Sequence, residues 1–262
     1  MVKIGCIGFG AMGSSLVSGF IHTGVNPGDI LVYDLAKKAR EKALANGLVV
    51  IDSLDELVLC DLILLAVKPQ NLDTVANKWI FKDKMIISIL AGITIEQLTQ
   101  VLGNQKIVRI MPNLPVQIGK GVLALHFSEA IVPDEKDMLR NLLSECGSLF
   151  ELEEKYFNAV TALSGSGPAF ILLFLEALAM GGVLEGLEAK TALEMATKTM
   201  LGTAEYLLTQ KQHPACLRDL VTSPAGTTAA GLLVLEENGV RAAIIKAVKA
   251  AAKRGEELSE GK

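Results

Sequence analysis

The sequence predicts an α/β fold, with a doubly wound sheet in the first part of the chain and an all-α part after it. In the first part, short apolar runs alternate with stretches of helical periodicity, a pattern typical of a parallel sheet covered by helices. After residue 155 the strand-like runs stop, and long segments rich in Ala, Leu, Glu and Lys follow. We therefore expect two domains, residues 1–155 and residues 156–262.

The expected strands are short and apolar, and a helix or a turn follows each of them. They span residues 2–7, 30–34, 49–51, 62–67, 85–90, 106–111 and 122–127. Helices are expected at 14–23, 36–46, 53–60 and 134–146, and one more starts at Thr94, where Gln97 completes a capping box. The second part contains five expected helices, at 168–186, 189–210, 214–221, 227–238 and 240–259.

Composition and charge exclude several classes of protein. Hydrophobic residues make up 50% of the chain and charged residues 21%, which is typical of a globular protein. The net charge of −4, without a basic stripe, argues against a nucleic-acid partner. The four cysteines lie far apart, and the three histidines lack metal-ligand spacing. We expect free thiols, no bound metal and a reducing, cytoplasmic compartment.

One uncharged stretch, residues 156–175, has about the length needed to span a bilayer. The segment 164–168 (SGSGP) lies in its middle, and a turn there would leave backbone groups unsatisfied in lipid. We expect a helix buried in a protein interface, with neither a transmembrane segment nor a signal peptide.

The segment from Gly8 to Gly13 reads G-x-G-x-x-G and lies between the first expected strand and the first expected helix. Asp34 ends the second strand about 20 residues later, as in the Rossmann dinucleotide-binding pattern. Gly8 permits the tight turn, Gly10 lets the backbone approach a pyrophosphate, and the helix N-terminus offers N–H groups to the anion. The alternative is a glycine turn without a ligand, but the combined context favours a dinucleotide.

Asp34 bears on the choice of dinucleotide. A carboxylate at this position accepts hydrogen bonds from the ribose hydroxyls of NADH and repels the 2′-phosphate of NADPH. Lys37, Lys38 and Arg40 follow closely and either offset that repulsion or form the solvated face of a helix. The sequence leaves the preference between NADPH and NADH open.

Three further strands end in small or Pro-punctuated turns, at residues 66–69, 88–92 and 111–113. Ligands of open α/β sheets bind at the carboxyl ends of the strands. Each turn taken alone could be a plain loop, but together they favour a shared cleft.

The segment 219–231 in the helical part predicts a second anion site. A Ser-Pro-x-Gly turn ends one helix, and Thr227 or Thr228 can cap the next. The turn directs backbone N–H groups and the hydroxyls of Ser223, Thr227 and Thr228 to one point, which suits a carboxylate. An ordinary helix–helix corner explains the same residues equally well.

Several segments together resemble the pyrroline-5-carboxylate reductase family from one end of the chain to the other. They are residues 7–13 (IGFGAMG), 66–69 (AVKP), 109–113 (RIMPN), 164–169 (SGSGPA), 223–231 (SPAGTTAAG) and 235–241 (LEENGVR). The Ser-Pro-x-Gly-x-Thr segment is highly specific, whereas many dehydrogenases share the glycine loop. Two positions depart from the family pattern: Ala225 stands where glycine is commoner, and Leu114 where a small polar residue is usual.

The resemblance implies an oxidoreductase that reduces the cyclic imine 1-pyrroline-5-carboxylate to L-proline with NADPH or NADH. It implies that the substrate carboxylate lies at Ser223, Gly226 and Thr227, and that Thr228 hydrogen-bonds the ring nitrogen as the catalytic residue. It implies a homodimer through the helical domain, with a pentamer of dimers and the acceptance of other cyclic imines left open. The dinucleotide would contact Ile7, Gly8, Phe9, Gly10, Ala11, Met12, Asp34, Ser53, Ala66, Val67, Lys68, Pro69, Ile89, Leu90 and Ala91.

Two other functions compete with this one. A β-hydroxyacid dehydrogenase shares the glycine loop and Gly165-Ser166-Gly167, but it places a catalytic lysine on the next helix, and here no lysine follows until Lys190. A non-catalytic paralogue that senses dinucleotides could let the Ser-Pro-x-Gly turn degenerate, and here that turn is intact. The reductase is therefore the preferred hypothesis.

Overall fold

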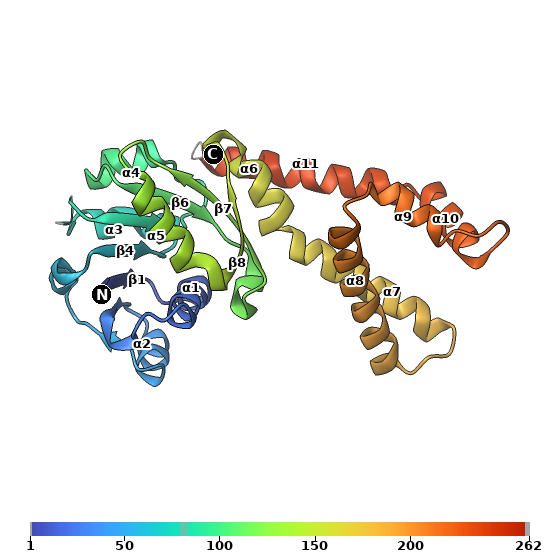
Figure 1. Ribbon diagram of the computed structural model, residues 1–262, viewed down its shortest axis with the longest axis horizontal. Helices are drawn as coiled ribbons and strands as arrows, with labels where there is room; N and C mark the ends of the chain where they lie inside the picture. Colours follow the sequence, from blue (N-terminus) through green and yellow to red (C-terminus); the bar gives the residue numbers. More distant parts are fainter. Residues whose placement is uncertain (1, 80, 82, 260–262) are drawn as a thin grey trace. The chain divides into compact units, whose positions relative to one another are not determined.

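The computed structural model describes residues 2–79, 81 and 83–259, which divide into two compact units (Figure 1). Unit 1 comprises residues 1–166 and 251–262, and unit 2 comprises residues 167–250. The boundary after residue 166 lies later in the chain than the expected boundary after residue 155. The end of the last helix, from residue 251 on, belongs to unit 1. Met1 and residues 260–262, which the expected domains include, lie outside the described residues.

Within the described residues of unit 1, one eight-stranded sheet has the order β3-β2-β1-β4-β5-β6-β7-β8. The strands are β1 (Ile4–Ile7), β2 (Ile30–Tyr33), β3 (Val49–Val50), β4 (Leu62–Leu65), β5 (Met85–Ser88), β6 (Ile107–Met111), β7 (Gly121–Phe127) and β8 (Gly147–Glu151). The strands from β3 to β6 run parallel, so this part of the unit has the Rossmann arrangement that the sequence predicts.

The far edge of the sheet differs from the expectation of a purely parallel sheet. β7 pairs antiparallel with β6, and β8 pairs parallel with β7. The connection from β6 to β7 contains only a 3-10 helix, Leu114–Ile118, and it is too short for the crossover that a parallel pair needs. β8 was not expected, because its residues are half-buried or exposed and make no continuous apolar run.

Helices cover both faces of this sheet (Figure 1). They are α1 (Ala11–His22), α2 (Lys37–Ala45), α3 (Leu72–Ala76), α4 (Ile95–Leu102), α5 (Pro133–Leu143) and α6 (Phe157–Val160). Leu62 and Leu64 of β4 pack in the core cluster with α1 and α5, whereas Ile63 and Leu65 pack in the cluster with α3 and α4. A strand buried on both faces explains why this segment is apolar throughout.

Local signals at helix starts have mixed outcomes. The capping box of Thr94 and Gln97 is confirmed, with reciprocal hydrogen bonds at the start of α4. The helix expected at 53–60 is a 3-10 helix, Leu54–Leu59, which Ser53 caps. The segment after Lys68, expected only to end a strand, continues into a short 3-10 turn (Pro69–Asn71) and α3.

The turn expected at 164–168 is not a break. The helix continues through a π-helical turn, Thr161–Gly165, in which the Ser166 N–H donates to the Thr161 carbonyl at 2.8 Å. The π-helical turn changes the backbone hydrogen bonds of the helix, and the buried side chain of Asn113 supplies a further one: its Nδ2 donates to the carbonyl of Ser164 at 3.0 Å. The whole stretch Glu154–Leu184 is long and apolar enough to cross a membrane by length and composition alone.

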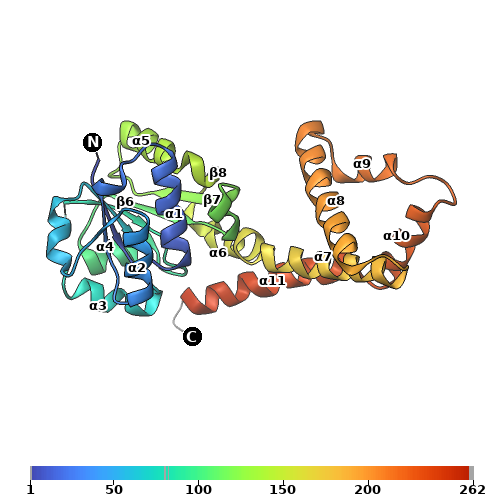
Figure 2. The same ribbon diagram turned by 90° about the horizontal axis from the view of Figure 1, so that it is seen from below.

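Unit 2 is an open arrangement of helices (Figure 2). It holds α7 (Gly167–Leu184), α8 (Ala189–Gln210), α9 (Pro214–Leu220), α10 (Thr227–Glu237) and the first part of α11 (Val240–Ser259). Its core cluster joins α7 to α8 and consists of Leu175, Ala179, Ala192 and Ala196. Most other apolar side chains of α7 stay exposed, among them Leu173 at 68% and Leu184 at 79%. The sequence therefore supplies far more apolar surface than this unit buries by itself.

Candidate functional site

The glycine loop between β1 and α1 owes its shape to close backbone contacts. Gly8 has φ +94°, and a Cβ on it would lie 2.7 Å from the carbonyl oxygen of Ala66. A Cβ on Gly13 would lie 2.4 Å from the carbonyl oxygen of Gly8. Because a backbone atom is the obstacle in both cases, a larger residue would have to displace the chain. The loop therefore lies directly against the end of β4.

Asp34 holds this loop from the end of β2. Its Oδ2 accepts from the Phe9 N–H at 2.6 Å, and its Oδ1 accepts from the Ala36 N–H at 2.7 Å. Both carboxylate oxygens are thus engaged by the backbone, which fixes the position of the negative charge. A carboxylate offers about four lone-pair sites, so each oxygen can still accept a further hydrogen bond.

The Cys6 thiol lies on β1 beneath the loop and donates to the carbonyl of Gly8 at 3.3 Å. Burial raises the pKa of this thiol well above its ordinary value, and the charge of Asp34 raises it further. Cys6 is therefore a neutral packing residue at physiological pH and not a nucleophile.

A cleft of about 640 Å³ opens beside the loop, at the carboxyl ends of β1, β2 and β4. It brings together seven of the residues that the sequence predicts to bind the dinucleotide: Ile7, Gly8, Gly10, Asp34, Ala66, Val67 and Lys68. These come from three separate strand ends, as expected for a ligand site of an open α/β sheet.

The other expected residues do not line this cleft. The Phe9 side chain is buried, and Leu90 at the end of β5 is buried as well. Ser53 lines a neighbouring hollow that it shares with Asp52 and Asp55. The remainder are Ala11 and Met12 in the first turn of α1, Pro69 after β4, and Ile89 and Ala91 after β5.

Eight lining residues were not among the expected ones: Tyr33, Leu35, Ala36, Leu54, Asn71, Thr74, Val75 and Lys78. The first three flank Asp34, so their proximity to it was a usable signal. The last four lie in the turn after Lys68, in α3 and just after α3. The sequence did not predict this short helix, and no motif marks its residues as part of a site.

The arrangement fits the pyrophosphate of a dinucleotide. A Cβ on Gly10 would have nothing within 4 Å, so the loop backbone is open on the side that an anion would approach. Among the described residues, no acceptor pairs with the N–H groups of Gly10, Ala11 or Met12, and the first turn of α1 contains no acidic side chain. The helix N-terminus therefore presents free donors and a positive dipole end beside the cleft.

The basic residues that follow Asp34 are mostly occupied. Lys37 pairs with Glu41, and Arg40 donates to the Ile51 carbonyl and to Asp52. Lys38 is the one of the three without a partner among the contacts of the described residues, and it is exposed. The Asp34 carboxylate has no ion-pair partner in the same set of contacts.

The predicted second anion site lies in unit 2, at the turn between α9 and α10. Gly226 is the N-cap of α10 and has no side-chain cap, so the prediction that Thr227 or Thr228 caps this helix is wrong. The helix begins at Thr227 because the Gly226 N–H already closes a turn onto the Ser223 carbonyl at 3.0 Å. Within the described part of the chain, the N–H groups of Thr227 and Thr228 have no acceptor.

Ala225 in this turn has φ 55°, in the left-handed region that favours glycine. It is the position at which the sequence departs from the expected glycine. Ser223 and Thr227 are exposed and Thr228 is half-buried, so the start of α10 is accessible.

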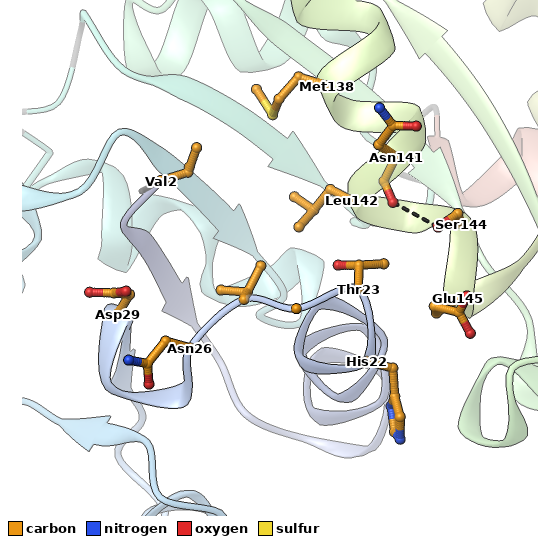
Figure 3. Close-up of a pocket in the computed structure, with 12 residues that line it drawn as sticks. Val2, His22, Thr23, Asn26, Asp29, Met138, Asn141, Leu142, Ser144 and Glu145 are labelled. Atoms are coloured by element: carbon orange, nitrogen blue, oxygen red, sulfur yellow. Dashed lines mark hydrogen bonds between the residues drawn. The ribbon is translucent and has the colours of Figure 1, made fainter.

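A further hollow of about 580 Å³ lies between the end of α1 and the end of α5 (Figure 3). His22, Asn26 and Asp29 line one wall, and Asn141 and Glu145 line the other. Asp29 directly precedes β2, so this hollow lies toward the amino ends of the strands. Ligands of this fold class bind at the opposite ends, where the glycine loop lies.

Comparison with known proteins adds two family models. One, described as pyrroline-5-carboxylate reductase dimerisation, matches residues 154–258. The other, described as NADP oxidoreductase coenzyme F420-dependent, matches residues 3–92. The first covers the helical part of the chain, and the second covers the strands from β1 to β5 with the glycine loop.

Full-length relatives match both parts together. The pyrroline-5-carboxylate reductase of Pisum sativum is 38% identical over 98% of this chain and 96% of its own. The crystal structure of the Streptococcus pyogenes enzyme has a TM-score of 0.90 at 36% identity, covering 98% of each chain. The Plasmodium falciparum enzyme, solved with NADP bound, has a TM-score of 0.89 at 32% identity, again over 98% of each chain.

Proposed function

The chain belongs to the pyrroline-5-carboxylate reductase family, a family of NAD(P)H-dependent oxidoreductases, and on that premise we propose how its own residues divide the work of the reaction. The reaction reduces 1-pyrroline-5-carboxylate to L-proline, the last step of proline biosynthesis. The proposal depends on one observation. The two anion-binding segments, the glycine loop before α1 and the Ser-Pro-x-Gly turn before α10, both present unpaired N–H groups at a helix N-terminus.

The dinucleotide lies along residues 7–12 and beside Asp34 and Ser53, and it continues over residues 66–69 and 89–91. The cleft beside the glycine loop supports this assignment, because seven of these residues line it. The free amides at the start of α1 suit its pyrophosphate. The expected residues that do not line the cleft contribute through backbone atoms of the glycine loop, the first turn of α1 and the ends of β4 and β5, and Ser53 contributes from the neighbouring hollow.

The substrate carboxylate binds at the turn before α10. The hydroxyls of Ser223 and Thr227 and the amides of Thr227 and Thr228 are its donors, and the carboxylate lies beside Gly226, whose own N–H is bound to the Ser223 carbonyl. The dipole of α10 and the unpaired N–H groups in its first turn support this role, since a carboxylate is an anion of the right size for one helix N-terminus.

The chain has little covalent chemistry to perform. The bound dinucleotide supplies a hydride, and a protonated cyclic imine is already a good acceptor for it. The protein must hold the two reacting carbons together and exclude water. Thr228 donates or accepts a hydrogen bond at the ring nitrogen and orients the ring, but a threonine hydroxyl is too weak an acid to be indispensable as a proton donor.

The helical part forms a homodimer, in agreement with the family model that covers it. The apolar side chains that α7 leaves exposed support this assignment, because burial in an interface removes them from water. We place the enzyme in the cytoplasm, with α7 in the dimer interface and not in a membrane. Sedimentation should show a dimer or a larger assembly, and a stable, active monomer would refute this part of the proposal.

The activity test is oxidation of NADH or NADPH by the purified protein with 1-pyrroline-5-carboxylate, followed by the loss of the reduced dinucleotide's absorbance. Thr228→Ala should lower kcat about 10- to 100-fold without abolishing turnover, whereas Thr228→Ser, which keeps the hydroxyl, should stay close to the parent enzyme. A complete loss of activity in folded Thr228→Ala would give the hydroxyl a larger role. A protein that binds the dinucleotide but does not oxidise it would overturn the reductase assignment.

A further inference from the structure

We infer that this enzyme prefers NADH to NADPH, and that the fixed, uncompensated carboxylate of Asp34 determines the preference. The inference rests on the proposed dinucleotide site and goes one step beyond it, to the group carried by the adenosine ribose. It concerns this chain's own residues. The Plasmodium falciparum relative, in contrast, was solved with NADP, the phosphorylated dinucleotide, bound.

The charge of Asp34 has a fixed position in the cleft. Asp34 lines the cleft at the end of β2, where the dinucleotide fold places the ribose of the adenosine half. Its two oxygens accept from the Phe9 and Ala36 amides at 2.6 and 2.7 Å, so the carboxylate cannot turn away without breaking the loop contact. The remaining lone pairs suit the two ribose hydroxyls, and both of these are donors.

No cation forms an ion pair with the Asp34 carboxylate within the described part of the chain. Arg40, which could face a phosphate, donates to the Ile51 carbonyl and to Asp52, and Lys37 pairs with Glu41. Lys38 is exposed, so its charge is largely screened. A 2′-phosphate at the ribose would therefore meet a fixed negative charge with little compensation.

The cleft wall formed by the residues just after Asp34 offers a phosphate no side-chain donor. The two residues after Asp34 that line the cleft are Leu35 and Ala36, and neither has a side-chain donor for a phosphate. Lys68 and Lys78 line the cleft from the side of β4 and α3. Lys78 also lines the neighbouring hollow that contains Asp52 and Asp55.

The test uses fragments without a nicotinamide ring, so that it depends on binding and not on catalysis. Isothermal titration of the full-length protein compares ADP-ribose with 2′-phospho-ADP-ribose, and NADH with NADPH as a second pair. We expect the unphosphorylated member of each pair to bind at least about tenfold more tightly. Equal affinities, or tighter binding of the 2′-phosphorylated fragment, would overturn the inference and leave the reductase function intact.

Variants separate the charge of Asp34 from its loop contacts. Asp34→Asn and Asp34→Ser weaken both fragments, because each leaves one acceptor oxygen for the two amides of Phe9 and Ala36, but they should shift the affinity ratio about tenfold toward the 2′-phosphorylated fragment. Asp61→Asn is the matched control, since it removes the same charge from a carboxylate that also accepts a backbone N–H, that of Lys3 at 2.9 Å, and it should leave the ratio unchanged. Lys78→Ala should weaken both fragments alike. An unchanged ratio in both Asp34 variants would refute the role of this carboxylate.

One outcome concerns the site itself. If neither fragment nor either whole dinucleotide binds to a folded protein, the proposed dinucleotide site fails, and the preference fails with it. A measurable affinity with the wrong ratio contradicts the preference alone, so the two failures remain distinct.

Discussion

Arg109 on β6 forms a buried ion pair whose removal should destabilise unit 1 strongly. Its Nη1 donates to Oε1 of Glu154 at 2.9 Å, and its guanidinium stacks 4.6 Å from the centre of the Phe157 ring. The same Oε1 accepts from the Ile95 N–H, at the first residue of α4, at 2.8 Å. One carboxylate thus joins the sheet to the start of a helix that directly follows the proposed dinucleotide contacts at residues 89–91.

The magnitude follows from burial. The Arg109 side chain is 7% exposed and the Glu154 side chain 24%, so neither charge regains full hydration when its partner is removed. Arg109→Met keeps most of the stem and should cost about 3 kcal/mol, at the lower end for a broken buried pair. Glu154→Gln keeps an acceptor for the Ile95 amide and should cost about 2 kcal/mol. The double variant should cost about 3 kcal/mol, which is less than the sum, because the unpaired charge is gone.

The assay is urea denaturation of the parent, the two single variants and the double variant at one protein concentration, since dimerisation makes apparent stability concentration-dependent. Lys37→Met is the control, because Lys37 and Glu41 form an exposed pair with side chains 90% and 61% accessible, and its loss should cost under about 0.5 kcal/mol. An Arg109→Met variant as stable as the control, or additive single effects, would refute the buried pair as a source of stability.

Two further predictions concern other parts of the chain. Ala225→Gly should relieve the strain of the left-handed backbone in the substrate turn. After the larger entropy of glycine in the unfolded chain is subtracted, the free energy of unfolding should rise by about 0.5 kcal/mol, whereas β-branched Ala225→Val should lower it. A lower Tm for the glycine variant would contradict the strain. Burial raises the pKa of Cys60 from 9.0 to about 11, with Asp61 adding to the shift, so the folded chain keeps a proton that the unfolded chain loses. Stability should fall as pH rises from about 9 to 11, by up to about 1.4 kcal/mol per pH unit for this thiol, and Cys60→Ala should reduce the slope; equal slopes would show that Cys60 does not contribute.

The main features of the fold could be predicted because they rest on local sequence signals. Continuous apolar runs such as residues 62–65 indicate strands buried on both faces, and the structure places them at the centre of the sheet. The capping box at Thr94 and the five helices after residue 166 are equally local, and they lie within a few residues of their expected bounds. Periodicity and caps act within one element, so no knowledge of the partner elements is needed.

The features that were missed depend on pairing or on compensation between distant residues. The antiparallel β7 follows from the length of one connection, and β8 is an edge strand with no apolar run of its own. Ser164 and Gly165 stay within a helix, in its π-helical turn, because Asn113, which is far away in sequence, donates a hydrogen bond to the Ser164 carbonyl. Small and polar residues at 164–166 look like a turn until that distant partner is known.

The candidate site shows the same division between local and distant causes. Gly8 and Gly13 are readable from sequence because a backbone contact excludes any side chain there, and the free amides of Thr227 and Thr228 follow from the turn that precedes them. The state of Asp34 is not readable in this way. Its carboxylate is held by an amide 25 residues away, and Arg40 is drawn off by Asp52, 12 residues further along. The sequence therefore identifies which kind of ligand the cleft takes, whereas the choice between two nearly identical dinucleotides depends on which charges the folded chain has already paired.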